Sequence, residues 1–327
     1  MYKTRLTELF GIEYPIIQGG MMYVATADLS AAVSDAGALG VMTALTQPTP
    51  EALTKEIARF RTITDKPFGV NLTFLPGLDP PNYDEYVKAI IESKVPIVET
   101  AGRSPEKYLP MLKEAGTKVI HKCTAVRHAL KAEKLGCDAV TIDGFECGGH
   151  PGENDTPGLV LIPVATAALK VPVVACGGFG NGQGLAAALA LGAEGICMGT
   201  RFMLTQEAPI HENVKNAMME GNELSTTLIF RSLRNTERVF NNEMAQEVSR
   251  IEKEKGDALT IHDIRHLVTG QNSKKAFTEG DPNAGVWSAG IVMGLINDIP
   301  DCRTLVSRIA GDAESIIKGR LQSAVGG

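Results

Sequence analysis

The sequence lacks several features that mark whole classes of protein. It has no run of about 18 apolar residues, so a transmembrane helix is not expected. The net charge is −6 and no lysine/arginine run occurs, which argues against a nucleic-acid partner. The N-terminal stretch MYKTRLTELFGIEYP has no apolar core of a secretory signal. We therefore expect a cytoplasmic globular protein.

Cysteine and histidine are sparse, and neither forms a metal-binding pattern. The six cysteines include no CxxC pair, and most lie in or beside apolar runs, which is typical of buried free thiols. His262 and His266 are four residues apart on a predicted helix, but the glutamate of a zinc-protease motif is absent. The prediction is no disulfide framework and no metal site.

The sequence does have a repeated alternation of short apolar runs and helical patterns. The apolar runs are hydrophobic on both faces, which is typical of parallel strands covered on both sides. The predicted strands are 15–18, 39–43, 68–72, 97–100, 118–122, 139–143, 171–175 and 195–198. The predicted helices between them are 26–36, 50–61, 83–93, 105–115, 125–135, 159–169 and 182–191.

Eight such units predict an α/β protein, a (β/α)₈ TIM barrel with an inserted helical subdomain after strand eight. An open doubly wound sheet is the alternative, but the first strand ends in QGGMM and not in GxGxxG. We expect the barrel to comprise 1–208 and 282–327, with a last helix at 302–321. The polar segment 209–281 is expected to be a helical insertion without a strong strand that covers the barrel mouth.

Ligands of such barrels bind at the C-terminal ends of the strands, so the residues that follow each strand are the candidate site. Strand seven leads into Cys176, Gly177 and Gly178, and strand eight into Gly199 and Thr200. Glycines before helix N-termini expose backbone N–H groups that can bind a phosphate, and the threonine adds a hydroxyl. Tight turns alone are the other explanation for these glycines.

Polar side chains at the other strand ends suggest redox chemistry on a ring-shaped ligand. Lys122 could stabilise an anionic ring, and the amides of Asn71 and Gln18 could pair with its polar edge. His150, in the glycine-rich loop after strand six, could act as a general base or as a hydrogen-bond donor to an anionic substrate. A solvated lysine, a turn-forming asparagine and a structural histidine are the alternatives.

Several motifs are shared with one family: PIIQGGMMYV, PFGVNLT, KVIHKCTAVRHALKAEKLGCDAV, DGFECGGHPGE, ACGGFGNG, MGTRF, RSLRNT and GVWSAG. They make the chain resemble the nitronate monooxygenases, formerly 2-nitropropane dioxygenases, and the related NADH:quinone reductases and FMN-containing enoyl-acyl-carrier-protein reductases. The resemblance implies an FMN-dependent oxidoreductase in which His150 is catalytic. The FMN contacts that it implies are Gly20, Met21, Asn71, Thr73, Lys122, Gly148, Gly177, Gly178, Gly199 and Thr200.

The resemblance implies three activities. The first is oxidation of alkyl nitronates with O₂, and the second is transfer of hydride from NADH to FMN and then to a quinone. The third is that of an enoyl-acyl-carrier-protein reductase-like enzyme, while a flavin-binding barrel without turnover is the non-enzymatic alternative. The exact residues of the motifs QGGM, GGHPGE, RSLRNT and WSAG are more similar to those of the quinone reductases. The segment 76–81 and Phe277, where a tyrosine is expected, depart from that branch. The oligomeric state stays open, with a homodimer as one option.

Overall fold

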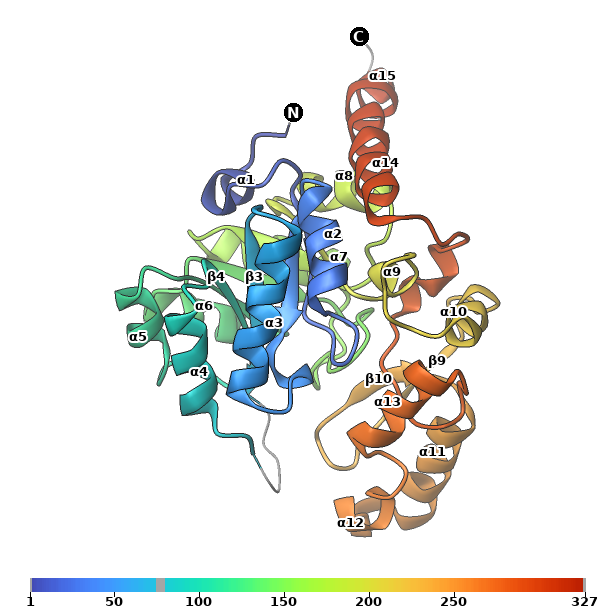
Figure 1. Ribbon diagram of the computed structural model, residues 1–327. Coiled ribbons are helices and arrows are strands. Elements are labelled where there is room, and N and C mark those ends of the chain that lie inside the picture. The colour runs from blue at the N-terminus through green and yellow to red at the C-terminus, as the bar shows by residue number, and fades with distance from the viewer. Residues whose placement is uncertain (1, 75–79, 326–327) are drawn as a thin grey trace.

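Eight parallel strands close into a barrel in the computed structural model, which describes residues 2–74 and 80–325 (Figure 1). Each strand pairs with its neighbour in chain order, and β8 pairs with β1 to close the ring. The strands are β1 (Ile16–Gln18), β2 (Leu39–Thr43), β3 (Phe68–Phe74), β4 (Ile97–Gly102), β5 (Lys118–Cys123), β6 (Ala139–Asp143), β7 (Val173–Cys176) and β8 (Gly195–Met198). The predicted TIM barrel is confirmed.

A first helix precedes β1, and further helices follow the strands β1 to β7. Those up to β8 are α1 (Arg5–Phe10), α2 (Ala27–Asp35), α3 (Pro50–Ile63), α4 (Tyr83–Glu92), α5 (Leu109–Glu114), α6 (Val126–Leu135), α7 (Gly158–Ala168) and α8 (Gly182–Ala190). After β8 come α9 (Thr200–Met203), α10 (Glu212–Met219), α11 (Glu243–Lys255), α12 (Ile261–Ile264), α13 (Gly270–Glu279), α14 (Cys302–Ser315) and α15 (Gln322–Ala324). No helix in the described ranges is long and apolar enough to cross a membrane.

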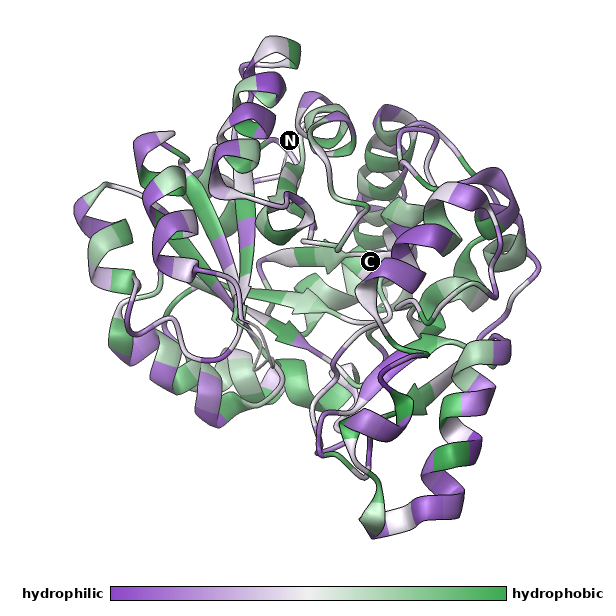
Figure 2. Cartoon of the chain, turned by 60° about the horizontal axis from the view of Figure 1, so that its bottom comes forward, coloured by the Kyte–Doolittle hydropathy of each residue, from purple (hydrophilic) through white to green (hydrophobic). Residues whose placement is uncertain are grey.

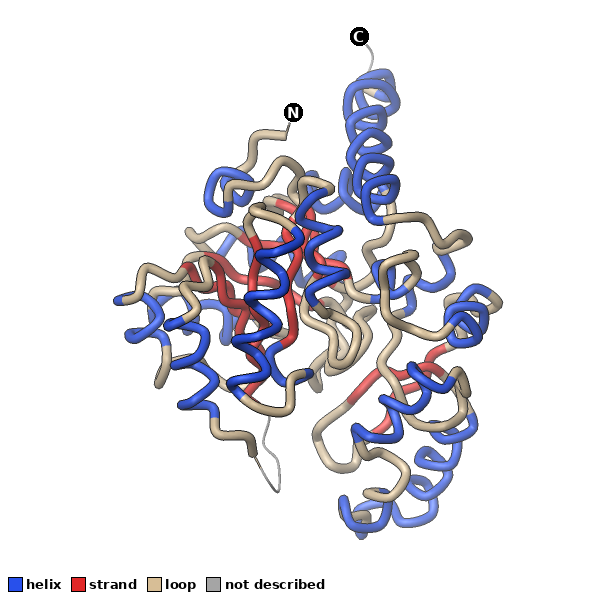
Figure 3. The backbone as a smooth tube through the Cα atoms, in the orientation of Figure 1, coloured by secondary structure: helices blue, strands red, loops and turns tan. Residues whose placement is uncertain are grey.

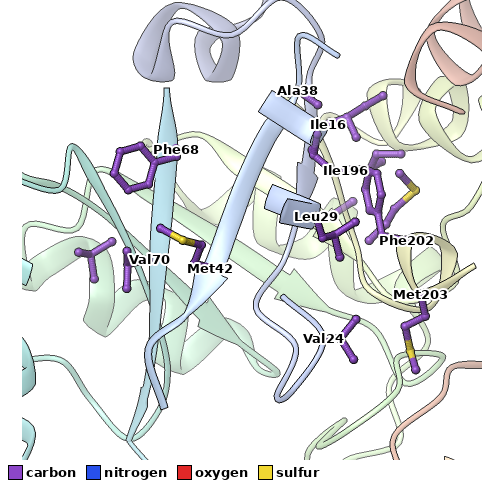
Figure 4. Packing of buried hydrophobic residues seen from close by; sticks show 14 of the residues in the cluster. Ile16, Val24, Leu29, Ala38, Met42, Phe68, Val70, Ile196, Phe202 and Met203 are labelled. Atoms are coloured by element: carbon purple, nitrogen blue, oxygen red, sulfur yellow. The ribbon is translucent and has the colours of Figure 1, made fainter. Parts of the chain in front are cut away.

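Two apolar layers hold the barrel together. Side chains such as Met42, Phe68 and Val70 point out of the strands toward the helices, where Leu29 of α2 packs (Figure 4). The alternate side chains fill the barrel interior, and Leu6 and Phe10 of α1 belong to that inner cluster. Figure 2 accordingly shows mostly hydrophobic strands inside helices that alternate hydrophobic with hydrophilic residues. This double burial is why the strands read as continuous apolar runs.

Two predicted boundaries shift because of proline. The β7 strand begins at Val173 and not at 171, because Pro172 has no N–H to donate to a ladder. Helix α5 begins at Leu109 and not at 105, because Pro110 is tolerated in the first turn of a helix but not in its interior. The last predicted helix is continuous to 321 but becomes π-helical from Ile316 to Leu321.

The prediction that 209–281 has no strong strand is wrong. Besides α10 to α13, this segment contains β9 (Thr226–Ile229) and β10 (Glu237–Phe240), an antiparallel pair that lies apart from the barrel strands (Figure 3). A separate apolar cluster, which includes Ile229, Val239 and Val248, supports it. The division of the chain at 209–281 stays a prediction. The chain then returns to the barrel, where α14 packs against α8 and α2.

Candidate active site

A cavity of about 880 Å³ opens at the C-terminal ends of the barrel strands. Its wall combines residues that follow the strands with Thr236 and Phe277 of the 209–281 segment and Trp287 of the returning chain. Except for Gln18, the predicted site residues line this one cavity: Gly20, Met21, Asn71, Thr73, Lys122, Gly148, His150, Cys176, Gly177, Gly178, Gly199 and Thr200. The structure thus brings together side chains that are up to 180 residues apart in sequence.

The loops after β7 and β8 present unused hydrogen-bond donors to the cavity. In the described part of the chain, no acceptor bonds to the amide N–H of Gly178, Gly199 or Thr200. The Thr200 hydroxyl accepts from the N–H of Gly290 at 2.9 Å, so its own hydrogen is left to donate. Gly178 has a left-handed backbone with φ of 84°, which few other residues adopt. This group of donors can bind an anion such as a phosphate.

A charged network lies at the floor of the cavity. Glu99, which is 1% exposed, accepts from the N–H of Gly20 at 3.0 Å and from the amide of Asn71 at 2.7 Å. The ammonium of Lys122 lies 3.4 Å from the other oxygen of Glu99. Thr73 donates to the amide oxygen of Asn71 at 3.0 Å, so both ends of that amide are oriented. A Cβ on Gly20 would lie 2.4 Å from Asn71, so glycine is needed there.

Protonation in this floor follows from burial and from the lysine. Burial alone would lower the pKa of Lys122, but Cys197, Glu99 and Asp143 hold that pKa well above its ordinary value. Burial raises the pKa of Asp143, against the effect of Lys122. A hydrogen bond with Cys197, together with burial, holds the pKa of the Cys176 thiol well above its ordinary value. These directions favour the charged form of Lys122 and the neutral thiol form of Cys176.

His150 has a defined tautomer. Its Nδ1 lies 3.1 Å from the carbonyl oxygen of Thr236, and since a carbonyl can only accept, Nδ1 carries the hydrogen. In the neutral ring Nε2 is then an acceptor, and it forms no hydrogen bond with the residues that the structure describes. The same loop is held by Glu153, whose carboxylate accepts from the N–H of Thr236 at 2.8 Å and from its hydroxyl at 2.7 Å. Gly149 and Arg238 exchange backbone hydrogen bonds alongside.

One side of the cavity is aromatic. Trp287 stacks on Phe240 with ring centroids 4.5 Å apart, and Phe277 packs against Trp287 at 6.0 Å. Tyr23 also lines the cavity, and its backbone is left-handed with φ of 64°, which is a strained conformation for an aromatic residue. Burial raises the pKa of its phenol. Planar apolar walls of this kind suit a ring-shaped ligand.

Some predicted roles are corrected. Gln18 does not lie in the cavity: its buried amide donates to the carbonyls of Gly19 and Val41 inside the barrel wall. Gly148 lines the cavity, but a Cβ there would lie 2.7 Å from the backbone of Ala289, so close packing also requires this glycine. The segment 76–81, which departs in sequence from the quinone-reductase branch, lies mostly outside the described residues, since 75–79 are not described.

Sequence reasoning missed Glu99, Asp143 and Thr236 as members of the site. A signal existed for Glu99, because a lone acidic residue in the apolar strand IVETAG is expensive to bury without a partner. Asp143 ends β6 in the same way. Thr236 had no such signal, since its role depends on the contact between two distant loops.

Comparisons with known proteins show the family and the fold. A family model described as "Nitronate monooxygenase" matches residues 3–90 and 77–312. A 5-hydroxy-7a-methyl-1-oxo-octahydro-1H-indene-4-carboxyl-CoA dehydrogenase of Rhodococcus jostii is 34% identical, with 95% of this chain and 96% of that protein covered. A probable nitronate monooxygenase of Staphylococcus aureus is 31% identical over 97% of this chain and 99% of that protein. The structure of FabK from Thermotoga maritima superimposes with a TM-score of 0.91 at 35% identity, covering 99% of this chain and 100% of that one.

Proposed function

Since this chain belongs to the nitronate monooxygenase family and is an oxidoreductase, we propose that it uses FMN to pass electrons from NADH to a quinone. The observation that carries the proposal is that one cavity brings together unused backbone donors, the Lys122 ammonium and His150. Because no dinucleotide fingerprint accompanies the compact donor group, a mononucleotide fits better than a dinucleotide cofactor.

The residues present fit FMN. The free N–H groups of Gly178, Gly199 and Thr200 would hold its phosphate. The Asn71 amide and the Lys122 ammonium would hold the polar edge of the ring, where a cation stabilises negative charge. FMN, when bound, accepts a hydride from one substrate and returns two electrons to another.

His150 would handle the proton that the overall reaction consumes. NADH, a quinone and one proton give NAD⁺ and a hydroquinone, so a proton must reach a quinone oxygen. The Nε2 atom of His150 can take up this proton and then donate it, because Nδ1–H is held by the carbonyl of Thr236. The exchange happens at one nitrogen while the other keeps the ring in place.

The aromatic wall favours a quinone as the electron acceptor. The cavity volume of about 880 Å³ lies toward the upper end of the range for small-molecule sites, which leaves room for a second ring beside the cofactor. The rings of Trp287 and Phe277 offer the flat apolar surface that a quinone would contact. They would also help to exclude water from the reacting atoms.

Oxidation of alkyl nitronates with O₂ is the second candidate. A nitronate is an anion, and the Lys122 ammonium would favour an anion in the cavity. The similarity to the protein named probable nitronate monooxygenase supports this reading as well.

Anaerobic mixing tests both candidates on one preparation. The purified protein is expected to be yellow and to release FMN, not FAD, on denaturation. Bleaching of the flavin by NADH, followed by recovery of colour on addition of a quinone, supports the reductase. Bleaching by an alkyl nitronate, and not by NADH, favours the oxidase. A colourless protein that cannot be reconstituted with FMN contradicts both.

A further inference from the structure

The carboxylate of Glu99 is buried among residues that come from three other parts of the barrel. Glu99 lies in the middle of β4, two residues after Ile97, whose side chain belongs to the cluster inside the barrel. Because strand side chains alternate, Glu99 also faces the interior. It is 1% exposed, so water does not solvate it.

The two oxygens of the Glu99 carboxylate have different partners. One oxygen, Oε2, accepts two hydrogen bonds, from Gly20 N–H at 3.0 Å and from Asn71 Nδ2 at 2.7 Å. The other, Oε1, forms no hydrogen bond in the described ranges, but the ammonium of Lys122 is 3.4 Å away. One side chain therefore contacts three of the predicted FMN-binding residues, Gly20, Asn71 and Lys122.

A buried ion pair of this kind is not explained by stability. Desolvating two charges costs several kcal/mol per ion, and an apolar pair of similar volume is often as stable or more stable. The interior cluster around the pair consists of residues such as Ile97, Ile120 and Val174, so apolar packing was available. The retained charges point instead to a role in the site above them.

We propose that Glu99 is a positioning residue of the cofactor site, which orients Gly20 and Asn71 and offsets the charge of Lys122. The inference rests on the proposed function, because it concerns the ring that these residues would hold. A flavin would then face a nearly neutral ion pair and not a free cation. The carboxylate would make the bound cofactor harder to reduce than the lysine alone would.

Opposite charge changes should shift the reduction potential of bound FMN in opposite directions. Glu99→Gln keeps the shape and one acceptor but removes the negative charge, so the potential should become more positive than that of the wild type. Lys122→Met removes the positive charge, so the potential should become more negative. The double variant should return toward the wild-type value. Potentials are measured by anaerobic titration against reference dyes, with flavin content and thermal unfolding recorded for each preparation.

Glu56→Gln is the matched control. Glu56 also accepts from a backbone N–H, that of Ala27 at 2.8 Å, and faces a cation, Arg59 at 2.9 Å, but it does not line the cavity. The reduction potential of bound FMN and the flavin content of Glu56→Gln should equal those of the wild type. A purely structural effect of losing a buried carboxylate would lower thermal stability in both glutamine variants without moving the potential.

The outcomes separate the two proposals. Normal flavin in the wild type with an unchanged potential and flavin content in Glu99→Gln overturns the inference alone. A wild type that takes up no flavin overturns the proposed function and this inference with it. If Glu99→Gln does not fold, Glu99→Asp decides, because its shorter carboxylate keeps the charge but cannot reach all partners. It should bind FMN at least about 10-fold more weakly than the wild type, and affinity within twofold contradicts the inference.

Discussion

At the scale of single residues, His150 combines a fixed ring with a free nitrogen. We expect His150→Ala to keep FMN and fold but to lose about 10²-fold or more in turnover, since positioned acid–base groups contribute 10²–10⁴-fold. Turnover per bound flavin is the measurement, with His262→Ala on the exposed face of α12 as the control. A wild-type rate per flavin in His150→Ala would remove this residue from the mechanism.

Gly199 offers the cleanest test of the phosphate site. Its φ of −108° is open to any residue, and a Cβ would meet nothing closer than Met21 at 3.6 Å. Gly199→Val should therefore fold normally while its methyl groups block the approach to the backbone donors, so flavin content should fall at least about 10-fold. Gly311→Val, on an open face of α14, should keep its flavin.

Gly178 is a less decisive position for the same experiment. Its φ of 84° makes any substitution strained, so lost flavin could reflect a distorted loop. Full flavin in Gly199→Val would mean that the phosphate binds elsewhere.

His121 makes the barrel wall sensitive to acid. Burial lowers its pKa to about 4, and contact with Thr100 offsets part of that effect. The folded pKa lies below the unfolded value of about 6.5, so the unfolded chain binds the proton more tightly and stability is lost as pH falls from 6.5 to 4. At pH 5 this group alone should cost about 2 kcal/mol relative to pH 8.

Urea unfolding at pH 8 and pH 5 measures this effect. The wild type should lose about 2 kcal/mol more between the two values than His121→Gln does. The control His262→Gln should behave as the wild type. Equal losses in all three proteins would mean that His121 is solvated in the folded state.

At the scale of elements, the β9–β10 hairpin positions the His150 loop. Glu153 of that loop holds Thr236 through two hydrogen bonds, and Thr236 in turn holds His150. We expect Glu153→Ala to retain flavin and to lose roughly 10- to 10²-fold in turnover, because small displacements of a reacting group are costly.

A second contact between the same two segments provides the control for Glu153. Arg231 and Asp155 form an ion pair whose side chains are 43% and 44% exposed. Exposed pairs contribute little, so Asp155→Asn should change turnover by less than about twofold. If Glu153→Ala and Asp155→Asn lose turnover equally, any loss of a contact to this loop lowers turnover. Glu153 would then have no specific role in positioning His150.

The elements differ in how well the sequence predicts them. The barrel strands were predictable within one or two residues because each is largely buried on both faces and has a glycine or proline within two residues of one end. The β9–β10 hairpin was not predictable, since its short strands pair with each other and, at Gly149 and Ser288, with loops from elsewhere in the chain.

The site residues also differ in how well the sequence predicts them. The glycines and His150 follow strand ends, which local sequence reveals. Glu99 left a signal as a lone acidic residue in an apolar strand, but its partners Gly20, Asn71 and Lys122, and the contact of Thr236 with His150, follow only from the folded chain.

At the scale of the whole molecule, cofactor binding should stabilise the fold. A ligand at 100 times its Kd stabilises by about 2.7 kcal/mol. Flavin-stripped protein should therefore show a Tm higher by several degrees with FMN. Riboflavin, which has the same ring but no phosphate, should give a much smaller shift at equal concentration. Equal shifts with the two flavins would assign no binding energy to the donors at Gly178, Gly199 and Thr200.

Helix α14 has a consequence for how the protein is made. It fills the place between α8 and α2 with Leu305, Val306 and Ile309, yet about a hundred residues of chain separate its start from the end of β8. At 5–20 residues per second, a ribosome needs roughly 5–20 s to synthesise that interval. Throughout this time all eight strands of the nascent barrel have been synthesised, while the apolar surface between α8 and α2 stays uncovered. A chaperone that binds exposed apolar surface has those seconds in which to act.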